Sequence, residues 1–229
     1  MTVATLLLRC AGIMQSWGTR SRFTIRETGL EPSKSGVVGI LCAAMGRPRS
    51  DDLKDLASLL MGIRVDFPGT VLVDYQTAKG VALAKGGKDT TNVQSRRYYL
   101  ADADFLVGLE GESGLLEHIY QALKSPVWAV SLGRKSYLPL VPLWIPDGMS
   151  ERGLEASLAE YPWPRIGKQV PDDKPETLRF IIETTPREGE ETRRDQPVGA
   201  AYGERSFALR HVTARFYKLG EEIPIRGDT

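Results

Sequence analysis

A glycine-bounded turn with amide and aromatic side chains follows a strand-like segment near the start of the chain. The apolar run Thr5–Cys10 leads into Ala11–Gly18, which carries Gln15 and Trp17. Segments that leave a sheet at a strand end often contact ligands, and glycine lets the backbone turn there. The pattern therefore predicts that Gln15 and Trp17 lie where a sheet meets a ligand.

Three arginines interleaved with an aromatic residue come next, namely Arg20, Arg22 and Arg26, with Phe23 between them. Guanidinium groups bind phosphates and aromatic rings stack on bases, so this composition on an irregular segment suits single-stranded RNA better than duplex DNA. The alternative is a loop with a core tryptophan and solvated arginines, because aromatic side chains are usually buried and arginines usually exposed. The local pattern leaves both interpretations open.

A second basic segment lies in the middle of the chain. Residues 77–94 are rich in glycine, lysine and threonine and poor in large apolar side chains. Between Gln76 and Arg97 a single acid accompanies five basic residues, which are Lys79, Lys85, Lys88, Arg96 and Arg97. Long loops in compact domains are usually functional or disordered, and this charge excess predicts a clamp for a phosphate backbone. Because neighbouring strand residues face opposite sides, we expect only one of Arg96 and Arg97 to point at that backbone.

Groups that could perform catalysis are few. We expect His118 on the packed face of a helix and His211 facing RNA or solvent. The sequence contains no Ser-His-Asp grouping, no His-Glu-x-x-His motif and no paired cysteines. Cys10 and Cys42 lie in apolar contexts and are expected to be buried, unpaired thiols in a reducing cytosol. The sequence thus predicts a binding protein with no catalytic residue, no metal site and no cofactor.

These side chains must be positioned by alternating strands and helices. We expect strands at 3–9, 63–67, 71–76, 103–109 and 127–132, and helices at 36–45, 51–60 and 113–124. Ser33 or Ser35 is the expected cap of the first helix. The order of elements is that of a ferredoxin-like, RRM-like domain, the split βαβ arrangement used by RNA-recognition domains. The segment at 77–94 is an insertion in its central hairpin.

The predicted fold class is α+β, with two parts. Residues 1–145 form the ferredoxin-like domain, and residues 146–229 form a small C-terminal antiparallel β region packed on it. The clearest strands of the second part are 178–184 and 215–219. The charged stretch 187–195 is expected to be a solvated loop.

Composition excludes few function classes. The 229 residues are 41% hydrophobic and 26% charged, which is ordinary for a globular protein. The net charge of +1 says little, because nucleic-acid binding depends on where charge lies. No run of about eighteen apolar residues and no signal-peptide pattern occurs. We therefore expect a cytoplasmic protein without membrane contact.

Several motifs, in order along most of the chain, resemble the CasD family of type I-E CRISPR Cascade complexes, which belongs to the RAMP superfamily. The most specific are Ala11–Gly18 and Pro32–Gly39. The match is extended by Asp74–Thr77, Arg96–Phe105, Leu132–Ser136 and Arg194–Pro197.

The resemblance implies a β-hairpin thumb at 77–94 and a palm that together grip the 5′ handle of CRISPR RNA (crRNA). It also implies that the subunit caps a backbone of CasC-type subunits beside the large CasA-type subunit. The residues expected at the RNA are Gln15, Trp17, Lys34, Ser35, Lys79, Lys85, Lys88, Arg96, Arg97, Arg134, Lys135 and Ser136. Some of these residues have a structural role as the alternative to RNA contact. Trp17 would anchor the core, and Lys34 and Ser35 would cap a helix. Residues 134–136 would form the polar end of the fourth strand.

Relatives in another subtype cleave precursor RNA, whereas in type I-E this task belongs to CasE. The leading hypothesis is therefore a non-catalytic RNA-binding subunit. The alternative is a metal-independent endoribonuclease that processes precursor CRISPR RNA.

Overall fold

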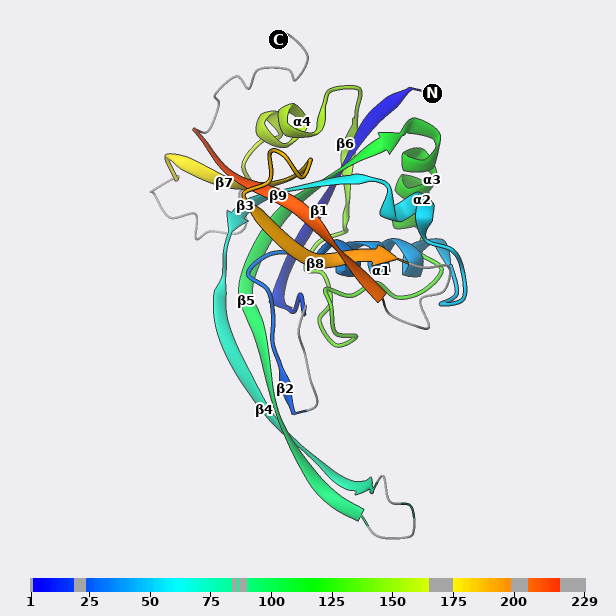
Figure 1. Ribbon diagram of the computed structural model, residues 1–229, viewed down its shortest axis with the longest axis vertical. Helices are drawn as coiled ribbons and strands as arrows, with labels where there is room; N and C mark the ends of the chain where they lie inside the picture. Colours follow the sequence, from blue (N-terminus) through cyan, green and yellow to red (C-terminus); the bar gives the residue numbers. More distant parts are fainter. Residues whose placement is uncertain are drawn as a thin grey trace.

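A long antiparallel sheet runs through the whole molecule, and a two-stranded ribbon projects from it (Figure 1). The computed structural model describes residues 2–18, 24–83, 86, 90–164, 175–198 and 206–218. Within these residues the strand order is β6-β1-β5-β3-β7-β9-β8, and β2 and β4 also pair with β5.

The described strands are β1 (Val3–Gln15), β2 (Ile25–Arg26), β3 (Leu60–Phe67), β4 (Thr70–Ala82), β5 (Thr90–Glu112), β6 (Trp144–Ser150), β7 (Thr177–Thr184), β8 (Glu191–Val198) and β9 (Ser206–Lys218). The described helices are α1 (Lys34–Met45), α2 (Lys54–Ala57), α3 (Ser113–Lys124) and α4 (Leu154–Glu160). None of these helices is long and apolar enough to cross a membrane.

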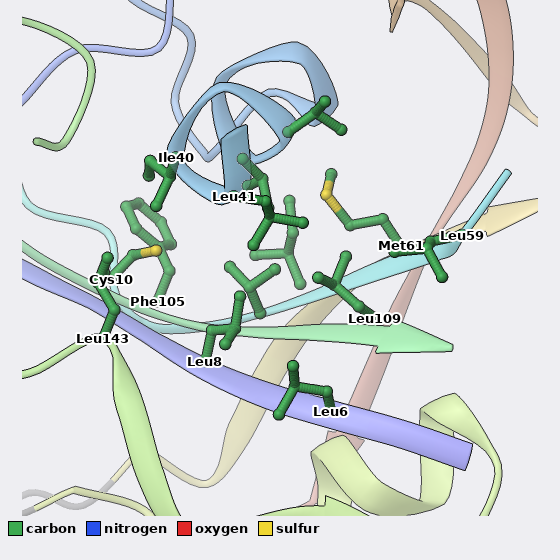
Figure 2. Packing of buried hydrophobic residues seen from close by; sticks show 14 of the residues in the cluster. Leu6, Leu8, Cys10, Ile40, Leu41, Leu59, Met61, Phe105, Leu109 and Leu143 are labelled. Carbon is green, nitrogen blue, oxygen red and sulfur yellow. The ribbon is translucent and has the colours of Figure 1, made fainter. Parts of the chain in front are cut away.

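The sheet is apolar on both faces because helices cover each of them. Alternate side chains of β1, such as Leu6 and Leu8, pack with α1 and α3 in the larger core (Figure 2). Leu7, from the opposite face of β1, packs with Leu154 and Leu158 of α4 in a second core. This two-sided burial explains the continuous apolar run at the start of the sequence.

The connection after α3 differs from the prediction. The expected strand at 127–132 is irregular, and the strand that pairs with β1 is β6, further along the chain. The backbone N–H groups of Val127 and Trp128 donate to the carbonyls of Ala44 and Ala43, at 2.9 and 3.0 Å. These bonds satisfy the C-terminal end of α1 and leave the segment off the sheet.

The ribbon is formed by β4 and the first half of β5. Their pairing runs from Thr70 opposite Ala101 to Ala82 opposite Thr90, so both strands reach further into 77–94 than expected. Gly69 begins the ribbon with a φ of +69°, and a Cβ there would lie 2.5 Å from the carbonyl oxygen of Ala101. The 23-residue β5 therefore belongs to the core at one end and to the ribbon at the other.

The C-terminal strands continue the sheet instead of forming a separate layer packed on it. β7 pairs with β3, and β9 and β8 follow in order. The stretch expected to be a solvated loop contains most of β8, and Asp195 is 2% exposed. The expected helix at 51–60 is the single turn α2, because the chain enters β3 at Leu60.

Candidate nucleic-acid interface

The predicted RNA-binding residues fall into a buried group and an exposed group. Gln15, Trp17 and Lys34 are at most 2% exposed. Lys79, Arg96, Lys135 and Ser136 are exposed, and Ser35, Arg97 and Arg134 are half-buried. Lys85 and Lys88 lie outside the described residues, as do Arg20, Arg22 and Phe23.

Gln15 and Trp17 are joined inside the protein. The Gln15 amide donates to the carbonyls of Cys10 and Ala103 at 2.9 and 2.6 Å, and accepts from the Trp17 indole at 3.1 Å. A Cβ on Gly36 would lie 2.9 Å from the Trp17 ring, so this glycine of α1 makes room for the indole. The two most specific motifs thus pack on each other, and burial argues against direct RNA contact by Gln15 or Trp17.

Lys34 is the centre of a buried ion pair. Its ammonium group donates to both carboxylate oxygens of Glu183 on β7 at 2.8 and 3.0 Å. Burial lowers the pKa of Lys34 from its ordinary value, and the neighbouring Glu183 opposes this shift. The side chain is therefore directed into the protein and away from any phosphate at the helix start.

Further polar contacts join the start of α1 to the C-terminal strands. Asp195 of β8 accepts the backbone N–H of Lys34 at 2.8 Å and pairs with Arg210 of β9 at 2.6 and 3.0 Å. Glu31 pairs with Arg179 and Arg193. The motif Pro32–Gly39 and the motif around Asp195 thus meet as a structural contact.

The start of α1 is capped by Ser33, one of the two predicted candidates. Its hydroxyl accepts the Gly36 N–H at 3.3 Å. Ser35 is half-buried, with its hydroxyl 3.5 Å from that of Ser33. These contacts are typical of helix capping.

Arg96 and Arg97 lie where β2 joins β5. The backbone N–H of Arg96 donates to the Thr24 carbonyl at 2.8 Å, and β2 pairs in parallel with both arginines. The Arg96 side chain is exposed, whereas the half-buried Arg97 side chain donates to Ser95 Oγ at 3.1 Å. Strand geometry places these two guanidinium groups on opposite faces, as alternation requires.

The loop 132–137 brings a further positive charge to this place. Gly133 has a φ of +97°, and a Cβ there would lie 1.8 Å from the Ser16 carbonyl oxygen, so the loop packs tightly on the end of β1. Arg134 donates to the carbonyls of Tyr98 and Arg26 at 2.9 and 3.3 Å. We call the cationic region formed by Arg26, Arg96, Arg97, Arg134 and Lys135 the basic junction.

An open groove lies beside the basic junction. It has a volume of about 520 Å³ and is lined by Thr24, Ile25, Tyr75, Asn92, Val93, Gln94, Ser95 and Arg96. Of these residues, sequence reasoning selected only Arg96. A signal for Asn92 and Gln94 was present, because they precede Arg96 with the two-residue period of a strand.

The structure corrects one expectation about the histidines. His118 is exposed on α3, because the buried face of that helix is formed by Leu116, Ile119 and Leu123. His211 is half-buried on β9. Both cysteines are unpaired, as predicted; Cys10 is buried as expected, whereas Cys42 is only half-buried. Burial raises the pKa of Cys10 to about 12 and that of Cys42 to about 11, so neither thiol is an activated nucleophile.

Comparisons with known proteins converge on one family. The family described as CRISPR-associated protein (Cas_Cas5) matches residues 5–213. The CRISPR system Cascade subunit CasD of Escherichia coli (strain K12) is 33% identical over 155 residues, which are 61% of this chain and 69% of that protein.

Two solved structures are similar over nearly the full length. One, described as the crystal structure of a Cas protein, is 45% identical with a TM-score of 0.77 and covers 96% of this chain and 98% of its own. The other belongs to a CRISPR RNA-guided surveillance complex. It is 30% identical with a TM-score of 0.74, and the match covers 94% of this chain and 90% of that chain.

Proposed function

Because this chain belongs to the CRISPR-associated Cas5 family, we propose that it is the non-catalytic subunit that grips the 5′ handle of crRNA in a type I-E Cascade surveillance complex in the cytoplasm. The observation that carries the proposal is the basic junction, where cations from β2, β5 and the loop 132–137 gather at the base of the ribbon. Guanidinium and ammonium groups from several adjoining elements are suited to binding a phosphate backbone.

The topology supports this role. The sheet order β6-β1-β5-β3 is antiparallel, with α1 and α3 packed on one face, which supports the proposed ferredoxin-like domain. The ribbon is inserted between β3 and the second half of β5, in the central connection of that arrangement (Figure 1). We assign the thumb to the ribbon and the palm to the sheet end beside the basic junction.

The exposed apolar side chains of the ribbon support contact with neighbouring proteins. Val71, Leu72 and Val73 are between 44% and 52% exposed. A two-stranded ribbon cannot bury both of its faces by itself. In the proposed assembly, partners of the CasC and CasA types cover the ribbon and the adjoining end of the molecule.

The assignment as a non-catalytic subunit is supported by where the candidate groups lie. Metal-independent cleavage needs a base for the 2′-hydroxyl and an acid for the leaving oxygen, and histidine is the commonest choice. His118 and His211 lie on α3 and β9, whereas the basic junction is built from β2, β5 and the loop 132–137. Neither histidine therefore lies on the elements that form the basic junction in the described part of the chain, which disfavours the alternative function as an endoribonuclease.

The proposal is tested by the salt dependence of RNA binding. The probe is an RNA oligonucleotide containing the 5′ handle of a type I-E CRISPR repeat. Replacing Arg96 with Ala should weaken binding and reduce the slope of log affinity against log salt by about 0.7, the value for one single-strand phosphate contact. The RNA should be recovered uncut, with or without magnesium.

Arg49→Ala is the matched control, because Arg49 is an exposed arginine in the connection between α1 and α2. It should leave the slope unchanged. Failure of the wild-type chain to bind the handle, or specific cutting of the RNA, would reject the proposed function.

A further inference from the structure

We propose that the groove beside β2 holds one unstacked base of the bound RNA, with Tyr75 as its stacking platform and Gln94 as its main reader. This inference deepens the proposed function and rests on it. It assigns a site for a nucleobase, preferentially adenine, next to the phosphate contact of Arg96.

The floor of the groove follows from strand geometry. Asn92, Gln94 and Arg96 alternate along β5 and therefore share one face. Tyr75 of β4 is the register partner of Arg96, so its ring lies on that same face. Tyr75 is 56% exposed, which presents its aromatic surface to the groove and to solvent.

The wall of the groove is β2. Thr24 is fixed to β5 by the N–H of Arg96, and Ile25, which is 49% exposed, stands opposite Arg96 in the parallel pairing. Among the described residues, β2 covers this edge of β5 only at Arg96 and Arg97. The volume of about 520 Å³ lies within the range of roughly 300–1,000 Å³ typical of small-molecule sites.

The side chains in the groove are complementary to a base and its phosphate. An aromatic ring stacks on any base, and a guanidinium group binds the adjoining phosphate. Glutamine can donate to and accept from adenine at once. The Asn92 carbonyl oxygen accepts the Gly80 N–H at 3.4 Å, which orients the Asn92 amide nitrogen as a donor. Gln94 is therefore the side chain that offers both a donor and an acceptor.

The test combines abasic sites in the RNA with substitutions in the groove. A series of handle oligonucleotides, each with one abasic position, is titrated against the full-length chain and the assembled complex. One position should lose about five- to 100-fold in affinity, the effect of one base–aromatic stack. Tyr75→Ala on intact RNA should cause the same loss, and combining it with that abasic site should cause no further loss.

Matched variants separate the roles. Tyr75→Phe should retain affinity, because the ring remains. Gln94→Ala should reduce discrimination between adenine and the other bases at the same position without changing the salt slope. Phe216→Ala removes an aromatic ring of β9 that is 66% exposed and lies outside the groove; it is the control and should bind like wild type. Urea unfolding of each variant checks that the fold is retained.

The outcomes distinguish this inference from the function on which it rests. If wild type binds the handle but tolerates every abasic site, or Tyr75→Ala binds equally well, the base site is rejected and the proposed function stands. If Gln94→Ala keeps the base preference, Gln94 is not its reader. If wild type does not bind the handle, the proposed function itself fails.

Discussion

Asp104 shows how a single buried carboxyl group can set the pH response of the protein. It is 2% exposed on β5, contacts the guanidinium group of Arg9, and its second oxygen has no hydrogen-bond partner among the described residues. Burial raises the pKa of Asp104 to about 6, although Arg9 opposes the shift. The folded protein therefore holds this proton at a pH where the unfolded chain has released it.

This shift predicts a loss of stability on raising the pH. An aspartate in the unfolded chain titrates near pH 4, so between about pH 4 and 6 the folded state binds more protons and the free energy of unfolding falls. The fall should total about 3 kcal/mol above pH 6. Urea unfolding at several pH values should show that Asp104→Asn has a flatter profile than wild type in this window. Parallel profiles would contradict the assignment.

The buried residues of the motifs explain why site residues were harder to predict than the family. Gln15, Trp17 and Lys34 have polar groups suited to RNA, and only their partners show that they serve the fold. Lys34 and its partner Glu183 lie 149 residues apart, so no local pattern could reveal their contact. In contrast, the sequence alone indicates that Arg96 and Arg97 face opposite sides of their strand, because the alternation of side chains along a strand is a local property.

At the level of elements, the sequence predicted what periodicity controls. The helix α3 was predicted at its observed bounds because its buried residues recur with helical spacing. The segment 127–132 has the composition of a strand, but its backbone is used to cap α1. β8 was missed because its charged side chains find buried partners far away in the sequence, as Arg193 does in Glu31.

The ribbon should be needed for assembly and dispensable for folding. Residues 77–94 contribute no described residue to the buried apolar core. Replacing them with a short Gly-Ser turn should change the free energy of unfolding by no more than about 0.5 kcal/mol, the range of surface substitutions. The variant should nevertheless fail to co-purify with an RNA-loaded complex. Normal co-purification would contradict the role of the ribbon as a thumb.

At the level of the whole molecule, the sheet joins the two parts that the sequence suggested. Ile181 of β7 and Val212 of β9 belong to the same core cluster as α1 and α3. The ion pair of Lys34 with Glu183 and the hydrogen bond from the Lys34 backbone N–H to Asp195 cross between the same parts. The N-terminal part thus depends on C-terminal strands for its packing and for the partners of its buried charge.

A truncated chain tests this dependence. Residues 1–152 keep β6 but lose α4 and the C-terminal strands, so Lys34 loses Glu183 and one face of the sheet loses its cover. Loss of one partner of a buried pair costs about 3–5 kcal/mol. We therefore expect no cooperative thermal transition by circular dichroism. The full-length chain, measured in the same way, is the reference. A cooperative transition of the truncated chain would show that this part folds independently.

The position of β1 in the sheet has a consequence for synthesis on the ribosome. Both neighbours of β1 come late in the sequence: β5 contributes Leu100–Glu112, and β6 begins at Trp144. At about 5–20 residues per second, the nascent chain exposes the apolar first strand for several seconds before β5 has emerged. During that interval β1 is a segment that chaperones can bind. The rate of translation through the ribbon determines how long β1 stays exposed.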